Sequence, residues 1–218
     1  HRKSNFELLR IFAMFSIVMF HFSLLGIASN VRLLGILPCD KINEFWVLFF
    51  ALFGKAGVNI FIILNGYFMF GKNNNFKKLL FLYLKAISYG FLFLALFTFF
   101  GNFSFETDKI IKSFFLLKYC DYWFVRDYII VNLLSPFLNK IANSINKNFF
   151  ILILCLMLVF CSFSSWIVTI RNDHILIIWF IFLYLFGGYL KMQNIKIERK
   201  YYLYFIAILI LILVYIIV

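Results

Sequence analysis

The stretch NFELLRIFAMFSIVMFHF, residues 5–22, is apolar enough to enter a lipid bilayer, yet it carries the ionisable residues Glu7, Arg10 and His21. An ionisable side chain at bilayer depth costs about 2.5–3.5 kcal/mol on insertion scales. Such a side chain is tolerated where it is paired, faces the interior of a helix bundle or lines a wet pathway. The stretch therefore predicts a transmembrane helix that keeps a polar site.

The three ionisable residues share one side of this predicted helix. At about 100° per residue, His21 lies within about 40° of Glu7, and Arg10 lies within about 60° of Glu7. Glu7 and Arg10 have the i,i+3 spacing of an ion pair near the inner membrane surface, and His21 lies about 16 Å beyond Arg10 along the axis. Two interpretations stay open: a functional site, or a salt bridge that anchors the helix and a histidine that bonds a neighbouring helix.

The composition extends this prediction to the whole chain. Of the 218 residues, 65% are apolar and 33 are phenylalanine, and the mean hydropathy is +0.98. Soluble domains are about 45–50% apolar, so a chain of this kind is predicted to be an all-α, polytopic transmembrane helical bundle. Its seven apolar segments span residues 6–28, 45–70, 79–100, 122–138, 149–168, 174–190 and 201–218.

The net charge of +12 is explained by topology, because the basic residues lie mainly between the apolar segments. With a cytoplasmic N-terminus, the inner linkers hold most of them, as the positive-inside rule requires. The sequence therefore predicts a multi-pass protein of the cell membrane whose basic linkers meet lipid headgroups. It has no nucleic-acid recognition pattern, so nucleic acid is not an expected partner. The predicted inner basic residues are Arg2, Lys3, Lys72, Lys77, Lys78, Lys140, Lys147, Lys191, Lys196, Arg199 and Lys200.

The last segment ends at Val218 without a flanking polar residue, which predicts that residues 1–218 are one transmembrane domain truncated at its C-terminus. Cysteine spacing gives no metal site, and no metal is expected. Cys155 and Cys161 lie in an apolar segment and are predicted to be packing residues. Cys39 and Cys120 fall on the same predicted outer side, as two free thiols or as a disulfide.

Other segments supply candidate partners for His21. Lys55 lies about ten residues into the second segment, near mid-membrane, and Arg126 and Asp127 lie about one turn below the outer surface. The Arg126–Asp127 pair also suits an ordinary interfacial position. By depth, these residues and His21 are predicted to share the outer half, while Arg10 faces the cytosol. This arrangement suits an anionic cofactor whose reactive end reaches His21, since imidazole can accept a proton from an attacking hydroxyl near neutral pH.

Four stretches, in this order, resemble the integral-membrane acyltransferase family three, the polysaccharide and lipid O-acyltransferases, most closely those of Gram-positive bacteria. The first is the opening stretch, with its E-x-x-R pair and an arginine followed by histidine after ten residues. The second, GKAGVNIFIILNGYF (54–68), is similar to the family's second helix, although Asn65 stands where many members have serine. The third and fourth are YWFVRDYIIVNLLSPFLN (122–139) and YLFGGYLK (184–191).

The resemblance implies a bacterial transferase that moves an acetyl group from cytosolic acetyl-CoA to a hydroxyl of a cell-envelope polysaccharide or lipid-linked sugar. It implies that His21 is the catalytic histidine and that Arg10, with Glu7, belongs to the same motif. In that enzyme, Arg10 and Lys55 are predicted to hold the donor's phosphates or to polarise its carbonyl. Members have about ten spans of about 20 residues each, so seven spans here agree with a truncated chain.

The acceptor site of this enzyme is predicted at Trp123, Arg126 and Asp127, because aromatic rings and carboxylates commonly contact sugars. The alternative is a transporter or flippase for an anionic lipid-linked sugar, which would use the same buried cations as a pathway. The sequence lacks the paired, Gly/Pro-interrupted helices that mark many transporter sites. It identifies neither the acceptor, nor the acyl group, nor the oligomeric state.

Overall fold

The computed structural model describes residues 4–23, 41–72, 76–100, 123–167 and 173–193. Every element within these ranges is an α-helix, so the all-α prediction is confirmed for the described part of the chain. Six of the seven predicted apolar segments are helical there. Residues 201–218, the loop 102–121 and the cysteines Cys39 and Cys120 lie outside the described residues.

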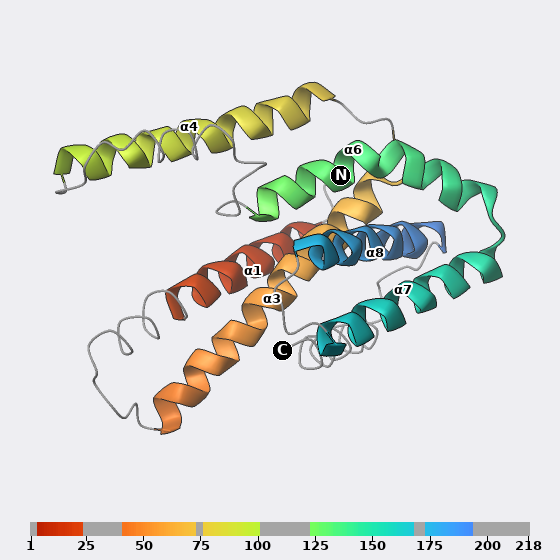
Figure 1. The fold of residues 1–218 in the computed structure, drawn as a ribbon, viewed down its shortest axis with the longest axis horizontal. Coiled ribbons are helices and arrows are strands. Elements are labelled where there is room, and N and C mark those ends of the chain that lie inside the picture. Colours follow the sequence, from red (N-terminus) through yellow and green to blue (C-terminus); the bar gives the residue numbers. More distant parts are fainter. Residues whose placement is uncertain (1–3, 24–40, 73–75, 101–122, 168–172, 194–218) are drawn as a thin grey trace. The chain divides into compact units, whose positions relative to one another are not determined.

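The helices form two compact units, which are described separately: residues 1–70 with 147–218, and residues 71–146. The first unit contains α1, α3, α7 and α8, and the second contains α4 and α6 (Figure 1). Their bounds are Ser4–His21 (α1), Lys41–Met69 (α3), Phe76–Phe100 (α4), Trp123–Ser144 (α6), Lys147–Ile167 (α7) and Asp173–Met192 (α8).

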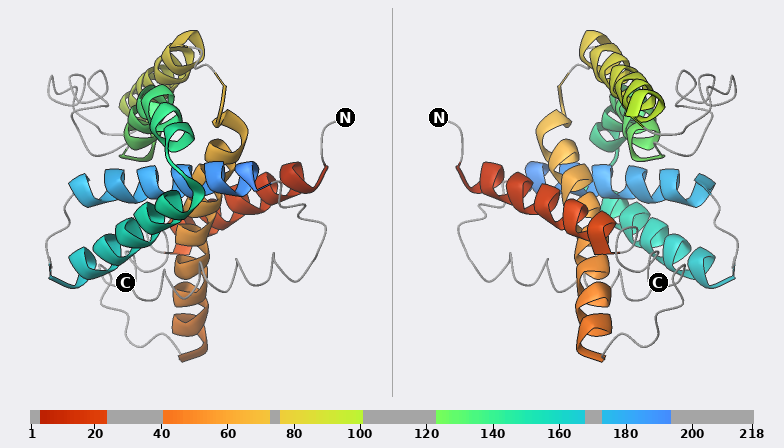
Figure 2. Two further views of the ribbon diagram at one scale, coloured as in Figure 1. Left: turned by 90° about the vertical axis from the view of Figure 1, so that its right-hand side faces the viewer. Right: turned by 90° about the vertical axis from the view of Figure 1, so that its left-hand side faces the viewer.

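Helix α3 is the centre of the first unit, and α1 and α8 both pack against it (Figure 2). Phe6 of α1 contacts Tyr67 of α3, whereas Phe20 lies beside Gly54, so α1 and α3 are antiparallel. In contrast, α8 runs parallel to α3. Its Trp179 donates a hydrogen bond to Asn59 at 3.0 Å, and its Lys191, about three turns later, donates to the carbonyl oxygen of Phe70.

Glycines bring α3 and α8 into backbone contact. A Cβ atom at Gly66 would overlap the carbonyl oxygen of Tyr184, and one at Gly187 would overlap the carbonyl oxygen of Ile63. Small residues at helix interfaces permit this close approach, and van der Waals packing rather than a hydrophobic force holds helices together in lipid. Tyr184 is fully buried at the contact.

A second glycine contact joins α3 to α1. A Cβ atom at Gly57 would lie 2.6 Å from the carbonyl oxygen of Ala13 and 3.2 Å from Cβ of Ser16. Ala13 and Ser16 are buried, and the Ser16 hydroxyl donates to the Phe12 carbonyl at 2.8 Å, which satisfies it within its own helix. Small residues of α1 therefore lie at its close contact with Gly57, with Ile17 beside them.

The fourth helix of this unit, α7, is antiparallel to α8. Lys147 at its start donates to Gln193 at 2.6 Å, and the rings of Phe150 and Tyr189 lie 5.9 Å apart. Helices α1 and α7 thus run in one direction, and α3 and α8 in the other. On α7, Cys161 is buried as predicted, but Cys155 is exposed.

Basic side chains of three helices lie toward the end of the first unit where α3 and α8 terminate. Arg10 of α1 meets Phe68 near the end of α3, and Lys191 of α8 bonds the Phe70 carbonyl just beyond it. Lys147 of α7 bonds Gln193, which directly follows α8. This end of the unit is therefore rich in positive charge.

In the second unit, α4 packs against α6. Helix α4 alone among the described helices has the length and apolar composition to cross a membrane, and Lys147–Phe163 and Ile177–Met192 are shorter apolar helices. The number of spans stays a prediction.

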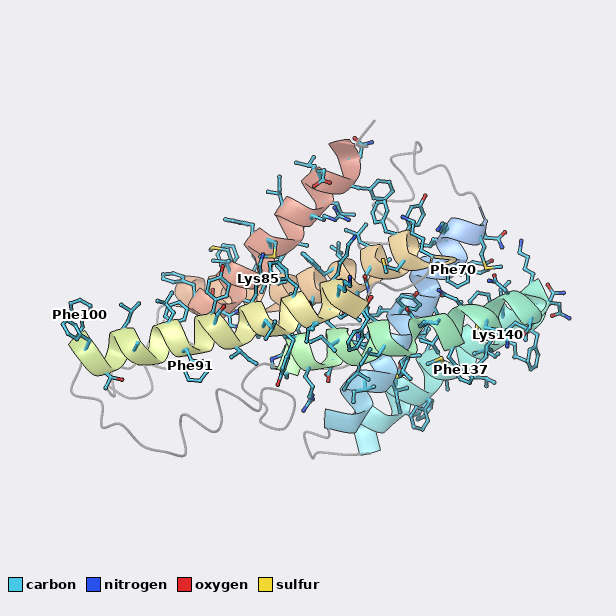
Figure 3. All side chains as sticks on the ribbon, turned by 90° about the horizontal axis from the view of Figure 1, so that it is seen from above. Phe70, Lys85, Phe91, Phe100, Phe137 and Lys140 are labelled. Atoms are coloured by element: carbon cyan, nitrogen blue, oxygen red, sulfur yellow. The ribbon has the colours of Figure 1, made fainter. Side chains whose placement is uncertain are left out.

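Lys85 lies midway along α4, where its ammonium is 4.7 Å from the centre of the Phe81 ring (Figure 3).

Helix α6 continues past the predicted boundary at residue 138 and ends at Ser144, so Lys140 belongs to the helix rather than to a linker. Pro136 lies inside it and cannot donate to the carbonyl of Asn132, which the regular helix would require. The Ser135 hydroxyl donates to that carbonyl instead, at 2.8 Å. A side chain thus replaces the missing backbone donor, and the helix persists through the proline.

The close approach at Gly66 predicts whether an alanine there would stabilise or destabilise the protein. Helix propensity favours Gly66→Ala by about 0.8–1.0 kcal/mol, whereas overpacking at a tight contact costs about 1–3 kcal/mol. We therefore expect Gly66→Ala to lower the thermal unfolding temperature of the purified protein in detergent. Asn143→Ala, which introduces the same side chain at an exposed position of α6, is the control and should have little effect. Stabilisation by Gly66→Ala would contradict the backbone contact.

Candidate functional site

The predicted Glu7–Arg10 ion pair is present on α1. Arg10 Nη1 donates to Glu7 Oε1 at 3.1 Å, one turn apart on the helix. The side chains of Glu7 and Arg10 are 42% and 40% exposed, which places the pair on a partly open surface rather than in the packed core. A half-exposed ion pair adds little stability, about 0–1 kcal/mol.

An aromatic cluster from α1 and α3 surrounds one face of Arg10. The guanidinium carbon lies 5.0 Å from the centre of the Phe68 ring, within the range of a cation–π interaction. Phe6 contacts both neighbouring rings of α3, with centroid distances of 5.2 Å to Tyr67 and 5.0 Å to Phe68. Glu7 and Phe68 thus hold Arg10 from two sides.

His21 ends α1, and the chain continues into a wider, π-helical turn at residues 22–23. Its Nδ1 lies 2.8 Å from the carbonyl oxygen of Ile17. A carbonyl oxygen can only accept, so Nδ1 carries a proton, and in the neutral ring Nε2 carries the lone pair. The ring also meets the Phe20 ring edge-on at 5.2 Å. His21 is exposed.

The ionisable residues of α1 are less buried than the residues that contact α3 most closely. Ala13, Ser16 and Ser23 are buried, whereas Met14, between Arg10 and His21 in the sequence, is 51% exposed. The close backbone contact with α3 uses the buried side. Arg10 and His21 are thus less buried than the residues at the closest contact with α3, although Arg10 itself contacts Phe68 of that helix.

Lys55 lies at the His21 end of the site. It is exposed and follows Gly54, which contacts Phe20, the neighbour of His21. Phe68, the contact of Arg10, is thirteen residues farther along α3, or about 20 Å. The structure thus brings Lys55 to the level of His21 and separates it from Arg10, although the sequence assigns both cations to the donor.

Trp123, Arg126 and Asp127 lie in the first turns of α6, in the other compact unit. Arg126 Nε donates to Asp127 Oδ1 at 2.8 Å, and the side chains are 10% and 0% exposed. Adjacent helix positions do not normally face each other, so this pairing bends the arginine back over its neighbour. Trp123 is half-buried beside Phe124, with the ring centres 6.1 Å apart.

Two neighbours of the site are not among the residues singled out from the sequence. Phe68 directly follows the Gly66–Tyr67 pair, and only the antiparallel packing of α1 and α3 brings it to Arg10. Lys191, which the sequence analysis treats only as a basic linker residue, bonds the Phe70 carbonyl at the end of α3. A clue to Phe68 is its position near a helix end, where aromatic side chains concentrate in membrane proteins.

The burial of the Arg126–Asp127 pair predicts that replacing one partner lowers the stability of the fold more than replacing both. Removing one partner leaves a buried charge and should cost about 3–5 kcal/mol, whereas replacing both with apolar residues should cost less. We expect Arg126→Leu and Asp127→Leu each to unfold at a lower temperature than the double variant in detergent. Additive losses in the double variant would argue against mutual compensation by this pair.

Comparison with known proteins assigns the chain to a family. Residues 3–218 match the family model described as acyltransferase domain, of acyltransferase family three. No match is found among curated proteins, and none among solved structures. The matched region contains the Glu7–Arg10 pair, His21 and the glycine contacts of α3. The chain therefore belongs to acyltransferase family three, a family of membrane-associated acyltransferases.

Proposed function

We propose that this protein is a membrane O-acyltransferase that moves an acetyl group from acetyl-CoA to a hydroxyl of a cell-envelope polysaccharide or lipid-linked sugar. The observation that carries the proposal is the hydrogen bond between His21 Nδ1 and the Ile17 carbonyl, at 2.8 Å. In the neutral form of the imidazole, this bond leaves Nε2 as the basic atom, and the side chain is exposed.

His21 acts as the general base. Nε2 accepts the proton of the sugar hydroxyl as its oxygen attacks the thioester carbonyl carbon. The carbon–sulfur bond then breaks, and the imidazolium returns the proton to the departing CoA thiolate. General-base assistance of this kind contributes about 10²–10⁴-fold to a rate.

Arg10 binds the donor's phosphates. Its guanidinium offers donors suited to a phosphate, and its half-exposed position leaves room for one. Lys55, at the level of His21, is better placed to polarise the thioester carbonyl than to share the phosphates with Arg10. The distance of about 16 Å along α1 between Arg10 and His21 matches a donor whose charged end and reactive end lie far apart.

The acceptor sugar is assigned to the start of α6, at Trp123, Arg126 and Asp127. The half-buried Trp123 ring is a stacking surface of the kind that sugars use, whereas Arg126 and Asp127, 10% and 0% exposed, would have to open to reach a sugar hydroxyl. This part of the proposal depends on the chemistry of the side chains alone.

The proposal includes a multi-pass arrangement with a cytoplasmic N-terminus. Alternating helix directions in the first unit support it, because α1 and α7 oppose α3 and α8. The basic end of that unit, with Lys147 and Lys191, would then face the cytosol, in agreement with the positive-inside rule. Acetyl-CoA would enter from this side.

The test is glycan acetylation in cells that express the protein or its variants. We expect His21→Ala to lower acetylation at least about 100-fold, because the base is removed. Phe15→Ala, at an exposed position of the same helix, is the control and should keep activity. The acetyl content of the surface glycan is measured by mass spectrometry, with the protein level checked by immunoblot.

Unchanged acetylation by His21→Ala at a normal protein level would end the assignment of this residue. A defect in glycan export with acetylation intact would instead favour a transporter or flippase.

A further inference from the structure

We propose that Phe68 of α3 is a positioning residue that holds Arg10 ready for the acyl donor, an inference that depends on the donor role of Arg10 in the proposed function. The guanidinium carbon of Arg10 lies over this ring, 5.0 Å from its centre. Phe68 acts through Arg10 and needs no contact with the donor.

The two contacts of Arg10 leave part of its guanidinium available. Nη1 is bonded to Glu7, and the guanidinium carbon lies over the Phe68 ring. Among the described residues, Nε and Nη2 have no hydrogen-bond partner. A phosphate can therefore bind the remaining donors without displacing either contact. An arginine fixed in this way loses less rotamer entropy when the anion arrives.

The Phe68 ring is itself fixed by its surroundings. Phe6 and Tyr67 contact it at centroid distances of 5.0 Å and 5.4 Å. Its helix is anchored two residues earlier, where Gly66 touches the backbone of α8. Phe68 therefore links the packing of α3 to the orientation of Arg10 on a different helix.

A purely structural role for Phe68 makes a different prediction. If the ring only fills space, its replacement should affect donor binding equally whether or not Arg10 is present. If the ring acts through the cation, its replacement should matter only while Arg10 is present. A double-mutant cycle separates the two cases.

The experiment measures binding of CoA and acetyl-CoA to the purified protein in lipid nanodiscs by calorimetry. We expect Phe68→Leu and Phe68→Met, which lack a ring, to raise Kd about 3- to 30-fold, the range of a cation–π interaction. Phe68→Tyr should stay within about twofold of the unmodified protein. Phe53→Leu is the matched control on α3, because Phe53 contacts rings but no cation in the described part of the chain, and it should also stay within about twofold.

In the cycle, Arg10→Ala should weaken binding, and adding Phe68→Leu to it should weaken binding no further. In turnover, Phe68→Leu should raise KM for acetyl-CoA with little change in kcat. Wild-type binding by folded Phe68→Leu or Phe68→Met would overturn the proposal, and so would additive effects in the cycle. Unchanged binding by Arg10→Ala would overturn the donor role of Arg10 itself, a distinct result.

Discussion

The first unit depends on the contact of helix backbones across glycine. In lipid, apolar side chains gain nothing from leaving a solvent that is equally apolar, so helices associate through close packing and polar contacts. Helix α3 has this contact on two sides, at Gly57 with Ala13 of α1 and at Gly66 with Tyr184 of α8. A side chain at either glycine would push α3 away from the helix that it contacts there.

The same packing decides which side of α1 stays open. Ala13 and Ser16 are buried where α1 meets Gly57 of α3, whereas Arg10 is half-exposed and His21 is exposed. The candidate site residues are therefore the more open part of this helix. The Arg10 side chain contacts α3 at the Phe68 ring.

Much of this was predictable from local rules. Apolar runs located the six described helices, and the i,i+3 spacing predicted the Glu7–Arg10 pair that forms at 3.1 Å. Boundaries were less accurate. The extension of α6 to Ser144 depends on the Ser135 hydroxyl that compensates for Pro136, and a hydropathy pattern does not register such a bond.

Contacts between helices were beyond reach of the sequence. The register between α1 and α3 puts Lys55 at the level of His21 and Phe68 beside Arg10. The register is set by the contacts of Gly54 with Phe20 and of Gly57 with Ala13. Helical periodicity gives the angle of each residue about its own axis and carries no information about the neighbour's axial offset. The site roles of Trp123, Arg126 and Asp127 stay predictions, since their helix belongs to a separately described unit.

The hydrogen bond of His21 to its own helix has a consequence for substrate selection. Since the imidazole is oriented by Ile17 and the guanidinium by Glu7, both groups are set within a single rigid rod. Any tilt or slide of α1 would carry them together and leave their spacing unaltered. Under the proposed chemistry, this fixed spacing selects donors by length. A thioester too close to the donor's phosphates would not reach His21, even with those phosphates bound at Arg10.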